Sequence, residues 1–573
     1  MIRTLLRSAW AAAALAAAAL SGCNSDEEIL GRPAPEIILS NPSGVYAVKT
    51  GRELLIAPEY RNAEEAVYVW LLDGEPCGDG PAYRFVGEEE GSRYLDLKVT
   101  TPGGTAAEQL RIDVEALTPP YITLPGAAEG FDVAAGTELH LAPVVQETLP
   151  ATFAWSVDGT EVAATREYTF VRTERGTYTL RFAATNEDGT EHVEFAVRVC
   201  SEEELPFGWE FDRTEFGVTT GRTLTVRPVS LRNEAGAEFV WTLDGTEVQR
   251  GTQSEYVFRA GGEPATHTLE AAMNKGGQSL RRQFAITVHP PKAGYRPATS
   301  SSRAACNAVY AFLPAPGQFV QFGYSAATME EACAHARKTL EDPEAGLSLG
   351  AFGGTLVVGF DHSIDRTEGY ELAIQGNPFE GSSEPGIVWV MQDENGNGLP
   401  DDTWYELKGS AWDDPDVVRG YAVTYYRPSG PGTDVVWRDN RGGGGILPRL
   451  EFHTQDYFYP LWADDGGTSY TLRGTLLPDR AYDQSEGTGE EEYWVLPDFG
   501  WGYADNWSAE AMDPDHGNLF RIADAVDDAG NPADLEYIDF VKVQTAQMAV
   551  HGRIGEASTE VFAIGDYTLL RRK

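Results

Sequence analysis

The side chains from Asp393 to Asp402 have the types and the spacing of a calcium-binding loop. Oxygen-bearing side chains stand at positions 1, 3 and 5 of this segment, glycine follows at position 6, and a carboxylate stands at position 9. Alternating oxygens can wrap a hard cation, glycine permits the sharp bend, and the backbone carbonyl at position 7 points inward. The predicted Ca²⁺ ligands are Asp393, Asn395, Asn397, the carbonyl of Leu399, Asp401 and Asp402.

The loop departs from the EF-hand pattern at position 12, where Trp404 replaces the bidentate glutamate. Asp402 or Glu406 has to supply the last carboxylate, and no pair of long helices is predicted around the loop. The alternative interpretation is an acidic Asn-Gly turn between two strands. If calcium binds here, we expect it to be structural rather than catalytic.

Catalytic motifs are missing from the sequence. Asp361, His362 and Ser363 are adjacent on a predicted strand end, where neighbouring side chains point to opposite faces and cannot form a relay. No Gly-x-Ser-x-Gly elbow, His-Glu-x-x-His helix or phosphate-binding Gly-Lys-Ser/Thr loop occurs. Spacing in sequence cannot locate a carboxylate pair for glycoside hydrolysis, so a carbohydrate-active hydrolase stays open as an alternative. We assign no catalytic residue.

Aromatic residues in glycine-rich, turn-like contexts are the candidate ligand contacts. Trp501, Tyr503 and Trp507 stand in such a context near the end of the chain. Aromatic faces beside polar side chains can hold a sugar ring or the flat face of a macrocycle. We predict that these three side chains are exposed and bind the ligand.

The segment that carries these candidates, residues 304–573, is predicted to be one β-rich domain. One helix is expected over residues 329–340, capped by Thr328 with Glu331 three residues on. Apolar, β-branched segments then predict strands at 354–360, 387–391, 421–426, 469–473 and 538–543. A jelly-roll or galactose-binding-like sandwich is the expected architecture, and an enlarged lectin-like sandwich is the alternative.

Three internal repeats precede this domain. Gly51-x-x-Leu-x-Ile-x-Pro recurs from Gly136 and again from Gly221, 85 residues apart each time. Each copy contains an alternating strand that ends in Trp-x-x-Asp-Gly. The tryptophan of this pattern is Trp70, Trp155 or Trp241. Short strands, Asp-Gly turns and a unit of this length predict immunoglobulin-like sandwiches with the tryptophan in the core.

The repeats resemble PKD-like domains, a family of extracellular sandwich modules, through the Trp-x-x-Asp-Gly core; the fuller Trp-Asp-Phe-Gly-Asp-Gly form is missing. The resemblance implies three spacer modules in a stalk. The complete expectation is an all-β chain of three tandem sandwiches and a larger sandwich domain. The predicted bounds are 35–117, 118–202 and 203–290 for the repeats, 291–303 for a linker and 304–573 for the last domain.

Charge and cysteine content narrow the function classes. The chain has 88 acidic and 44 basic residues, a net charge of −44, which would repel a polyanion, so we exclude nucleic acid as a partner. Apart from Cys23, four cysteines are present, with no metal-binding spacing. Cys306 and Cys333 could pair in an oxidising compartment, or all four could be buried thiols.

The N-terminus resembles a bacterial lipoprotein signal. Arg3 and Arg7 precede an alanine/leucine run over residues 9–20, and Leu-Ser-Gly-Cys23 follows. The run is shorter than the ~20 residues of a membrane-spanning helix. The resemblance implies a signal peptide over 1–22, lipidation of Cys23 and a tether over 23–34. The acidic residues 26–28 resemble the surface-export signal of lipoproteins in Bacteroides-like bacteria.

Several segments of the last domain resemble a family of Bacteroides-type cell-surface proteins with PKD-like repeats. The matching segments are 314–319, 349–354, 359–364, 376–379, 384–388, 500–506 and 555–560. The resemblance implies an outer-membrane, surface-exposed lipoprotein that captures a glycan or corrinoid-type nutrient beside a TonB-dependent transporter. It implies no catalytic mechanism. An adhesin or structural scaffold is the third alternative.

Overall fold

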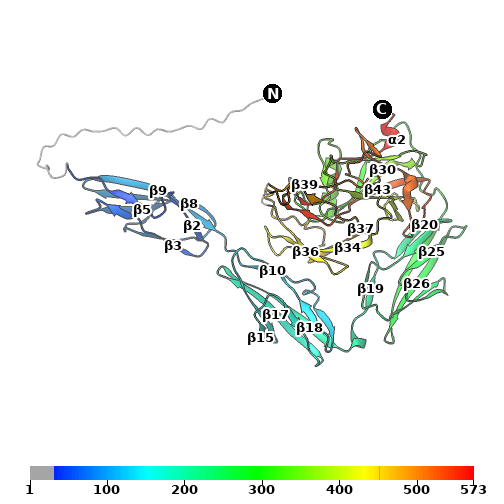
Figure 1. The fold of residues 1–573 in the computed structure, drawn as a ribbon, viewed down its shortest axis with the longest axis horizontal. Coiled ribbons are helices and arrows are strands. Elements are labelled where there is room, and N and C mark those ends of the chain that lie inside the picture. Colours follow the sequence, from blue (N-terminus) through cyan, green and yellow to red (C-terminus); the bar gives the residue numbers. More distant parts are fainter. Residues whose placement is uncertain (1–30, 451, 489–490, 573) are drawn as a thin grey trace. The chain divides into compact units, whose positions relative to one another are not determined.

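A sandwich of one topology occurs three times before the last domain in the computed structural model, which describes residues 31–450, 452–488 and 491–572 (Figure 1). The predicted signal peptide, Cys23 and most of the tether lie outside the described residues. The chain divides into two units, Met1–Thr118 and Pro119–Lys573. The first unit holds the first repeat. The second holds the other two repeats and the C-terminal domain, for which we keep the range 304–573.

Each repeat pairs its sheet strands in the same order. The five-stranded sheets run β2-β9-β8-β5-β6, β11-β18-β17-β14-β15 and β20-β27-β26-β23-β24, and in each the first strand named is parallel to the second. Two smaller pairs complete each sandwich: β1-β4 and β3-β7, β10-β13 and β12-β16, β19-β22 and β21-β25. The predicted immunoglobulin-like, all-β class is confirmed.

The bounds of these strands follow the repeats. The first repeat contains β1 (Glu36–Ile38), β2 (Val45–Lys49), β3 (Glu53–Ile56), β4 (Glu59–Arg61), β5 (Val67–Leu72), β6 (Glu75–Gly78), β7 (Tyr83–Val86), β8 (Gly91–Thr101) and β9 (Gly104–Glu115). The second contains β10 (Tyr121–Thr123), β11 (Phe131–Ala134), β12 (Leu139–Leu141), β13 (Val144–Gln146), β14 (Thr152–Val157), β15 (Thr160–Ala163), β16 (Tyr168–Phe170), β17 (Gly176–Asn186) and β18 (Gly189–Cys200). The third contains β19 (Gly208–Glu210), β20 (Glu215–Thr219), β21 (Thr223–Val226), β22 (Ser230–Arg232), β23 (Glu238–Leu243), β24 (Thr246–Gly251), β25 (Tyr256–Arg259), β26 (Ala265–Lys275) and β27 (Gln278–His289).

The repeated tryptophans form the cores, as predicted. Trp70, Trp155 and Trp241 are each 0% exposed. The Asp-Gly pairs that follow them make the predicted turns, because both residues of each pair have positive φ, as at Asp73 (+48°) and Gly74 (+89°). Since an aspartate tolerates this conformation and a glycine favours it, the dipeptide fixes the hairpin and the register of the tryptophan strand.

The C-terminal domain is built from three larger sheets. A six-stranded sheet has the order β28-β30-β43-β32-β33-β42, and four-stranded sheets have the orders β40-β41-β31-β47 and β36-β35-β34-β37. The six-stranded sheet and the β31 sheet share one core, which includes Val388, Val541, Leu372 and Phe520, and the β34 sheet packs a second core around Tyr425. The sequence predicts a single sandwich of two sheets, and the β34 sheet with its own core is an addition to that prediction.

The bounds of its elements begin with β28 (Ala308–Leu313), α1 (Met329–Thr339), β29 (Leu347–Ser348), β30 (Thr355–Asp365), β31 (Leu372–Gln375), β32 (Gly386–Met391), β33 (Trp404–Leu407), β34 (Val418–Tyr426), β35 (Val435–Asp439) and β36 (Gly444–Leu447). They continue with β37 (Ser469–Leu476), β38 (Tyr482–Asp483), β39 (Trp494–Val495), β40 (Met512–Asp513), β41 (Gly517–Phe520), β42 (Ala525–Val526), β43 (Tyr537–Thr545), β44 (Val550–His551), β45 (Gly555–Glu556), β46 (Glu560–Val561), β47 (Ala563–Asp566) and α2 (Tyr567–Leu570).

Helix α1 begins as predicted, with the Thr328 side chain accepting a hydrogen bond from the Glu331 N–H. None of the helices in the described residues is long and apolar enough to cross a membrane. Cys77, Cys200, Cys306 and Cys333 are free thiols, so Cys306 and Cys333 do not form a disulfide in this structure.

The third repeat contacts the C-terminal domain directly. Arg213 donates to the backbone carbonyls of Asp401 and Asp402, each at 2.9 Å. Arg222 forms an ion pair with Glu394 at 3.1 Å. The segment 291–303, predicted as a linker, also packs on this domain, because Arg296 pairs with Asp539 at 3.1 Å. The third repeat is therefore more than a spacer.

Candidate functional site

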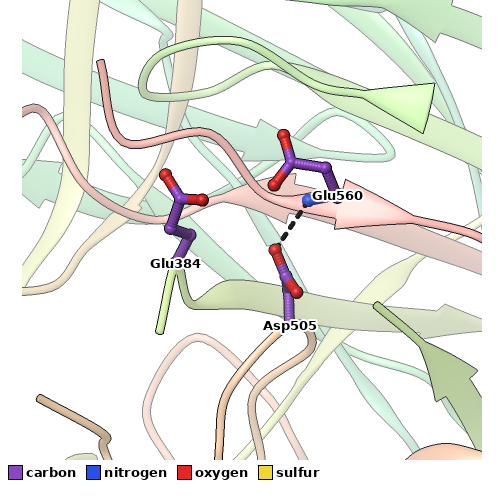
Figure 2. A group of neighbouring side chains, drawn as sticks. All are labelled: Glu384, Asp505 and Glu560. Carbon is purple, nitrogen blue, oxygen red and sulfur yellow. Dashed lines mark hydrogen bonds between the residues drawn. The ribbon is translucent and has the colours of Figure 1, made fainter. Parts of the chain in front are cut away.

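Three carboxylates from distant segments converge inside the C-terminal domain. Glu384 precedes β32, Asp505 lies in the loop before β40, and Glu560 begins β46. One carboxylate oxygen from each lies within 4.8 Å of the other two, and Figure 2 shows the three side chains around a common space. Within the described part of the chain, this is the one group of three His, Cys, Asp or Glu side chains that converges in this way.

Backbone hydrogen bonds fix this carboxylate cluster. The Glu560 N–H donates to the Asp505 carboxylate at 2.8 Å (Figure 2). The Asn377 N–H donates to the other oxygen of this carboxylate at 2.9 Å. The Ser558 N–H donates to the Glu384 carboxylate at 2.9 Å. A Cβ at Gly376 would lie 2.3 Å from an Asp505 oxygen, so only glycine permits this approach.

Burial sets the protonation of the cluster. Asp505 is 1% exposed. Burial, followed by the charge of Asp505, raises the pKa of Glu384 to about 8, and burial raises the pKa of Asp505 to about 7. Burial and the two neighbouring acids raise the pKa of Glu560 well above its ordinary value. Without a cation, these three acids therefore retain protons near neutral pH, because like charges in a low dielectric repel one another.

An oxygen-only donor set of this kind suits a hard divalent cation, which would take the place of the protons. Two donors on one Ca²⁺ can lie up to about 5 Å apart, since each Ca–O bond is about 2.3–2.6 Å. The cluster suits general acid–base chemistry less well, because both Asp505 oxygens already accept backbone hydrogen bonds.

The predicted calcium loop connects β32 to β33 and is closed by its own hydrogen bonds. The Asp393 carboxylate accepts hydrogen bonds from the N–H groups of Asn397 and Gly398, at 3.1 and 3.0 Å. The side-chain amides of Asn395 and Asn397 donate to the two oxygens of Asp401, at 2.9 and 2.8 Å. The Leu399 side chain is exposed. The predicted oxygens thus lie in one loop, and calcium binding there stays a prediction.

The structure separates the two candidates for the last carboxylate. Asp402 is buried in the loop, where it accepts hydrogen bonds from the N–H groups of Glu394 and Asn395 at 2.7 and 3.3 Å. Burial, with the charge of Glu394, raises its pKa to about 7. The Glu406 carboxylate accepts a hydrogen bond from the Thr475 hydroxyl at 2.6 Å, so its partner lies on β37 and not in the loop. Asp402 is the better candidate.

The three aromatic candidates have different environments. Tyr503 is 2% exposed, and its hydroxyl accepts a hydrogen bond from the Ala411 N–H at 3.1 Å, so its predicted exposure is wrong. Its bulk fills a small core with Phe499, which explains why an aromatic residue stands in this turn. Trp501 is half-buried, with the Arg521 guanidinium 5.8 Å from its ring centroid. Trp507 is 41% exposed and can offer a ring face to a ligand.

Asp361 and His362 contact each other although they are adjacent on the strand, whereas Ser363 has a different partner. His362 contacts Asp361 and Asp566, at 2.8 and 3.0 Å, while the Ser363 hydroxyl donates to Asp539 at 2.6 Å. Serine and histidine thus have separate partners, and the His362 side chain is buried among carboxylates.

Sequence reasoning did not find the carboxylate cluster. Its three residues lie in segments 384–388, 500–506 and 555–560, which resemble one protein family, but nothing in their spacing places the carboxylates together. The only sequence feature that could have indicated the cluster is a short turn with glycine or serine beside each of the three acids. Such turns are also common on ordinary loops.

Comparisons with known proteins support the module type. A model of the PKD-like domain family matches residues 34–101 and 119–186, in the first two repeats. No curated protein matches the chain. A three-domain I-band fragment of titin is 13% identical with a TM-score of 0.21, covering 44% of this chain and 98% of the fragment. The N-terminal domains of the outer capsid protein Hoc from bacteriophage RB49 are 12% identical with a TM-score of 0.21, covering 45% of this chain and 100% of theirs. Fibronectin(III)-like modules of Clostridium thermocellum CbhA are 13% identical with a TM-score of 0.16, covering 31% and 99%.

Proposed function

We propose that this chain is a surface-exposed outer-membrane lipoprotein that captures an extracellular nutrient without chemical turnover. Lipidated Cys23 anchors it, the sandwich repeats present the C-terminal domain, and that domain binds a glycan or corrinoid-type ligand. A TonB-dependent transporter is the partner that receives the ligand. The three repeats with their PKD-like character supply the surface or structural part of this function.

One observation carries the proposal. Each repeat is a self-contained sandwich whose largest side chain, a tryptophan, is fully buried in its own core. Such modules have no unfilled apolar face that needs a ligand, so the first two repeats act as spacers, while the third also docks on the C-terminal domain. The C-terminal domain, in contrast, holds three carboxylates that converge from distant segments of the chain.

A structural calcium ion in the loop Asp393–Asp402 is part of the proposal. The loop contains the carboxylates of Asp393 and Asp401 and the side-chain amides of Asn395 and Asn397, and it lies beside the contact with the third repeat. A cation there would neutralise acids that otherwise repel one another, and would stabilise both the loop and the contact.

The test is a thermal-shift screen of the soluble chain that begins at residue 24, against glycans and corrinoids, with turnover of every glycan assayed in parallel. We expect at least one ligand to raise the melting temperature and to be recovered unchanged. Product formation would support the hydrolase instead. The absence of any stabilising ligand would favour an adhesin or scaffold.

The anchor is tested on cells. Proteinase added to intact cells should degrade the protein, and Cys23→Ala should release a soluble or uncleaved form. Protection until the cells are lysed would contradict surface exposure.

A further inference from the structure

A cleft of about 470 Å³ lies where the third repeat meets the C-terminal domain. This volume is within the ~300–1,000 Å³ range of small-molecule sites. The repeat contributes Phe216 and the strand residues Thr223 and Thr225, and the C-terminal domain contributes three tryptophans, Trp389, Trp404 and Trp412. Because two modules form its walls, the cleft exists only when the third repeat is docked.

The floor of the cleft is the outward face of the six-stranded sheet. Lys542 on β43 pairs with Trp389 on β32, and Trp389 pairs with Glu406 on β33, so the three residues form one row across three strands. Their neighbours Val390 and Val541 face the apolar core. Since side chains alternate along a strand, the row faces away from that core and into the cleft.

Lys542 is the unusual member of this row. Its ammonium lies 4.3 Å from the ring centroid of Trp389 and 5.0 Å from that of Trp404. Among the residues that the structure describes, it has neither a hydrogen bond nor an ion pair. Burial lowers its pKa to about 8, although Glu406 opposes the shift, so the amine is mostly protonated at neutral pH. A half-buried cation that lies against two aromatic rings and has no hydrogen-bond partner can receive an anionic group.

One further polar atom at the cleft has no partner. The Trp389 indole N–H is buried and makes no hydrogen bond within the described structure, and Trp389 lines the cleft. Unpaired buried polar groups are costly, so a ligand with hydroxyl or carboxylate oxygens would recover that cost.

The charge of the cleft differs from that of the chain. Its lining has five Lys or Arg residues and four Asp or Glu residues, whereas the whole chain has 44 and 88. Several of these charges are already satisfied: Arg227 pairs with Asp528 at 2.8 Å, and Arg473 donates to the Val229 carbonyl at 3.1 Å. Lys542 is thus the lining cation that remains for a ligand on the floor.

We propose that the cleft binds the carboxylated residue of an acidic saccharide, with its carboxylate on Lys542 and its ring against the indoles. The indole surfaces suit the C–H faces of a sugar, and the Trp389 N–H and the Glu406 carboxylate can bind ring hydroxyls. The inference rests on the proposed ligand capture and assigns it a site and a ligand class.

The test is calorimetric titration of the chain that begins at residue 24 with galacturonic acid trimer and with its methyl ester, which keeps the rings but removes the charge. A hyaluronan tetrasaccharide and sialyllactose extend the acidic series. We expect at least one acid to bind, and in the galacturonate pair the acid to bind at least tenfold more tightly than its ester. Absence of binding by all three acids, or equal affinity for acid and ester, would overturn the proposal.

Lys542→Met should abolish the preference for the acid while retaining the side-chain length. Lys408→Met is the matched control, because Lys408 also lies on an indole face, 5.4 Å from the Trp412 centroid, but is not among the cleft residues. Trp404→Phe is the second variant, and should weaken binding with little change in melting temperature. Undiminished acid binding in both cleft variants would overturn the site. If the wild-type chain then still bound another ligand, the proposed capture function would survive that failure.

Discussion

Arg222 of the third repeat lies 3.1 Å from Glu394 of the C-terminal domain, and the two side chains are 16% and 1% exposed. The same guanidinium contacts Gln392, in the segment that leads into the predicted calcium loop. This buried ion pair joins the two walls of the cleft. The docking of the third repeat is therefore a specific contact, made by charged groups that would be costly to bury alone.

Arg222→Ala should separate the third repeat from the C-terminal domain, because it leaves Glu394 buried without its cation. We expect a cost of about 3–5 kcal/mol in the free energy of unfolding. Arg227→Ala is the control, because its pair with Asp528 is mostly exposed and such pairs contribute at most about 1 kcal/mol. Chemical denaturation measures both. Equal effects of the two substitutions would mean that the contact is weak.

Trp70→Ala should unfold the first repeat and leave the rest of the chain folded. The side chain is fully buried and donates to the Gly80 carbonyl at 2.8 Å, so its loss should cost about 3–5 kcal/mol in that repeat. Tyr94→Ala, at an exposed position on the same sandwich, should cost far less. Limited proteolysis should show cleavage only within the first repeat. Loss of ligand binding by the C-terminal domain would contradict a spacer role.

The carboxylate cluster should make the metal-free protein less stable as the pH rises. Raised pKa values, about 8 at Glu384 and about 7 at Asp505, mean that the folded state holds protons more tightly than the unfolded chain. The resulting stability is fully present below about pH 4 and is lost as the pH rises through 7 to 8. Denaturation between pH 5 and 9 in the presence of EDTA measures the slope.

Glu384→Gln should make this slope shallower, because it removes one of the coupled acids, whereas the exposed Glu380→Gln should not. Calcium that binds among the carboxylates should cancel the slope of the wild-type protein. Identical slopes for the wild type and Glu384→Gln would show that the cluster does not govern the pH dependence.

Calcium should stabilise the loop Asp393–Asp402. A metal that binds only the folded state contributes RT ln(1 + [L]/Kd), which is about 4 kcal/mol for ~1 mM calcium at a micromolar Kd. EDTA should lower the melting temperature, and calcium should restore it better than magnesium, which prefers a tighter shell. Asp393→Ala should remove this response, and the exposed Asp413→Ala should keep it. A response that survives Asp393→Ala but is lost in Glu384→Gln would assign the ion to the carboxylate cluster.

The repeats could be predicted from the sequence because their determinants are local. Trp70 and the Asp73-Gly74 turn lie within five residues, so strand, turn and core position can be read together. The same applies to helix α1, whose cap and first turn are adjacent. Continuous apolar, β-branched segments also predicted main strands of the C-terminal domain, such as β30 and β43.

The sites could not be predicted in the same way, because they depend on strand order and on docking. Lys542, Trp389 and Glu406 form a row only because β43, β32 and β33 are neighbours, although β43 lies far from the other two in the sequence. Tyr503 shows the converse error, since a glycine-rich context indicated exposure where the side chain fills a core.

Capture of an acidic saccharide by intact cells is the most direct test of the central claim. Cells that display the wild-type chain or Lys542→Met are incubated with the labelled acidic oligosaccharide that binds the purified chain, and the bound saccharide is recovered and sized. The account predicts that cells with the wild-type chain bind the saccharide and that cells with Lys542→Met do not. Proteinase treatment of intact cells should remove the binding, and the bound saccharide should be recovered at its original length. Shortened saccharide, or binding that appears only after lysis, would contradict capture at the cell surface.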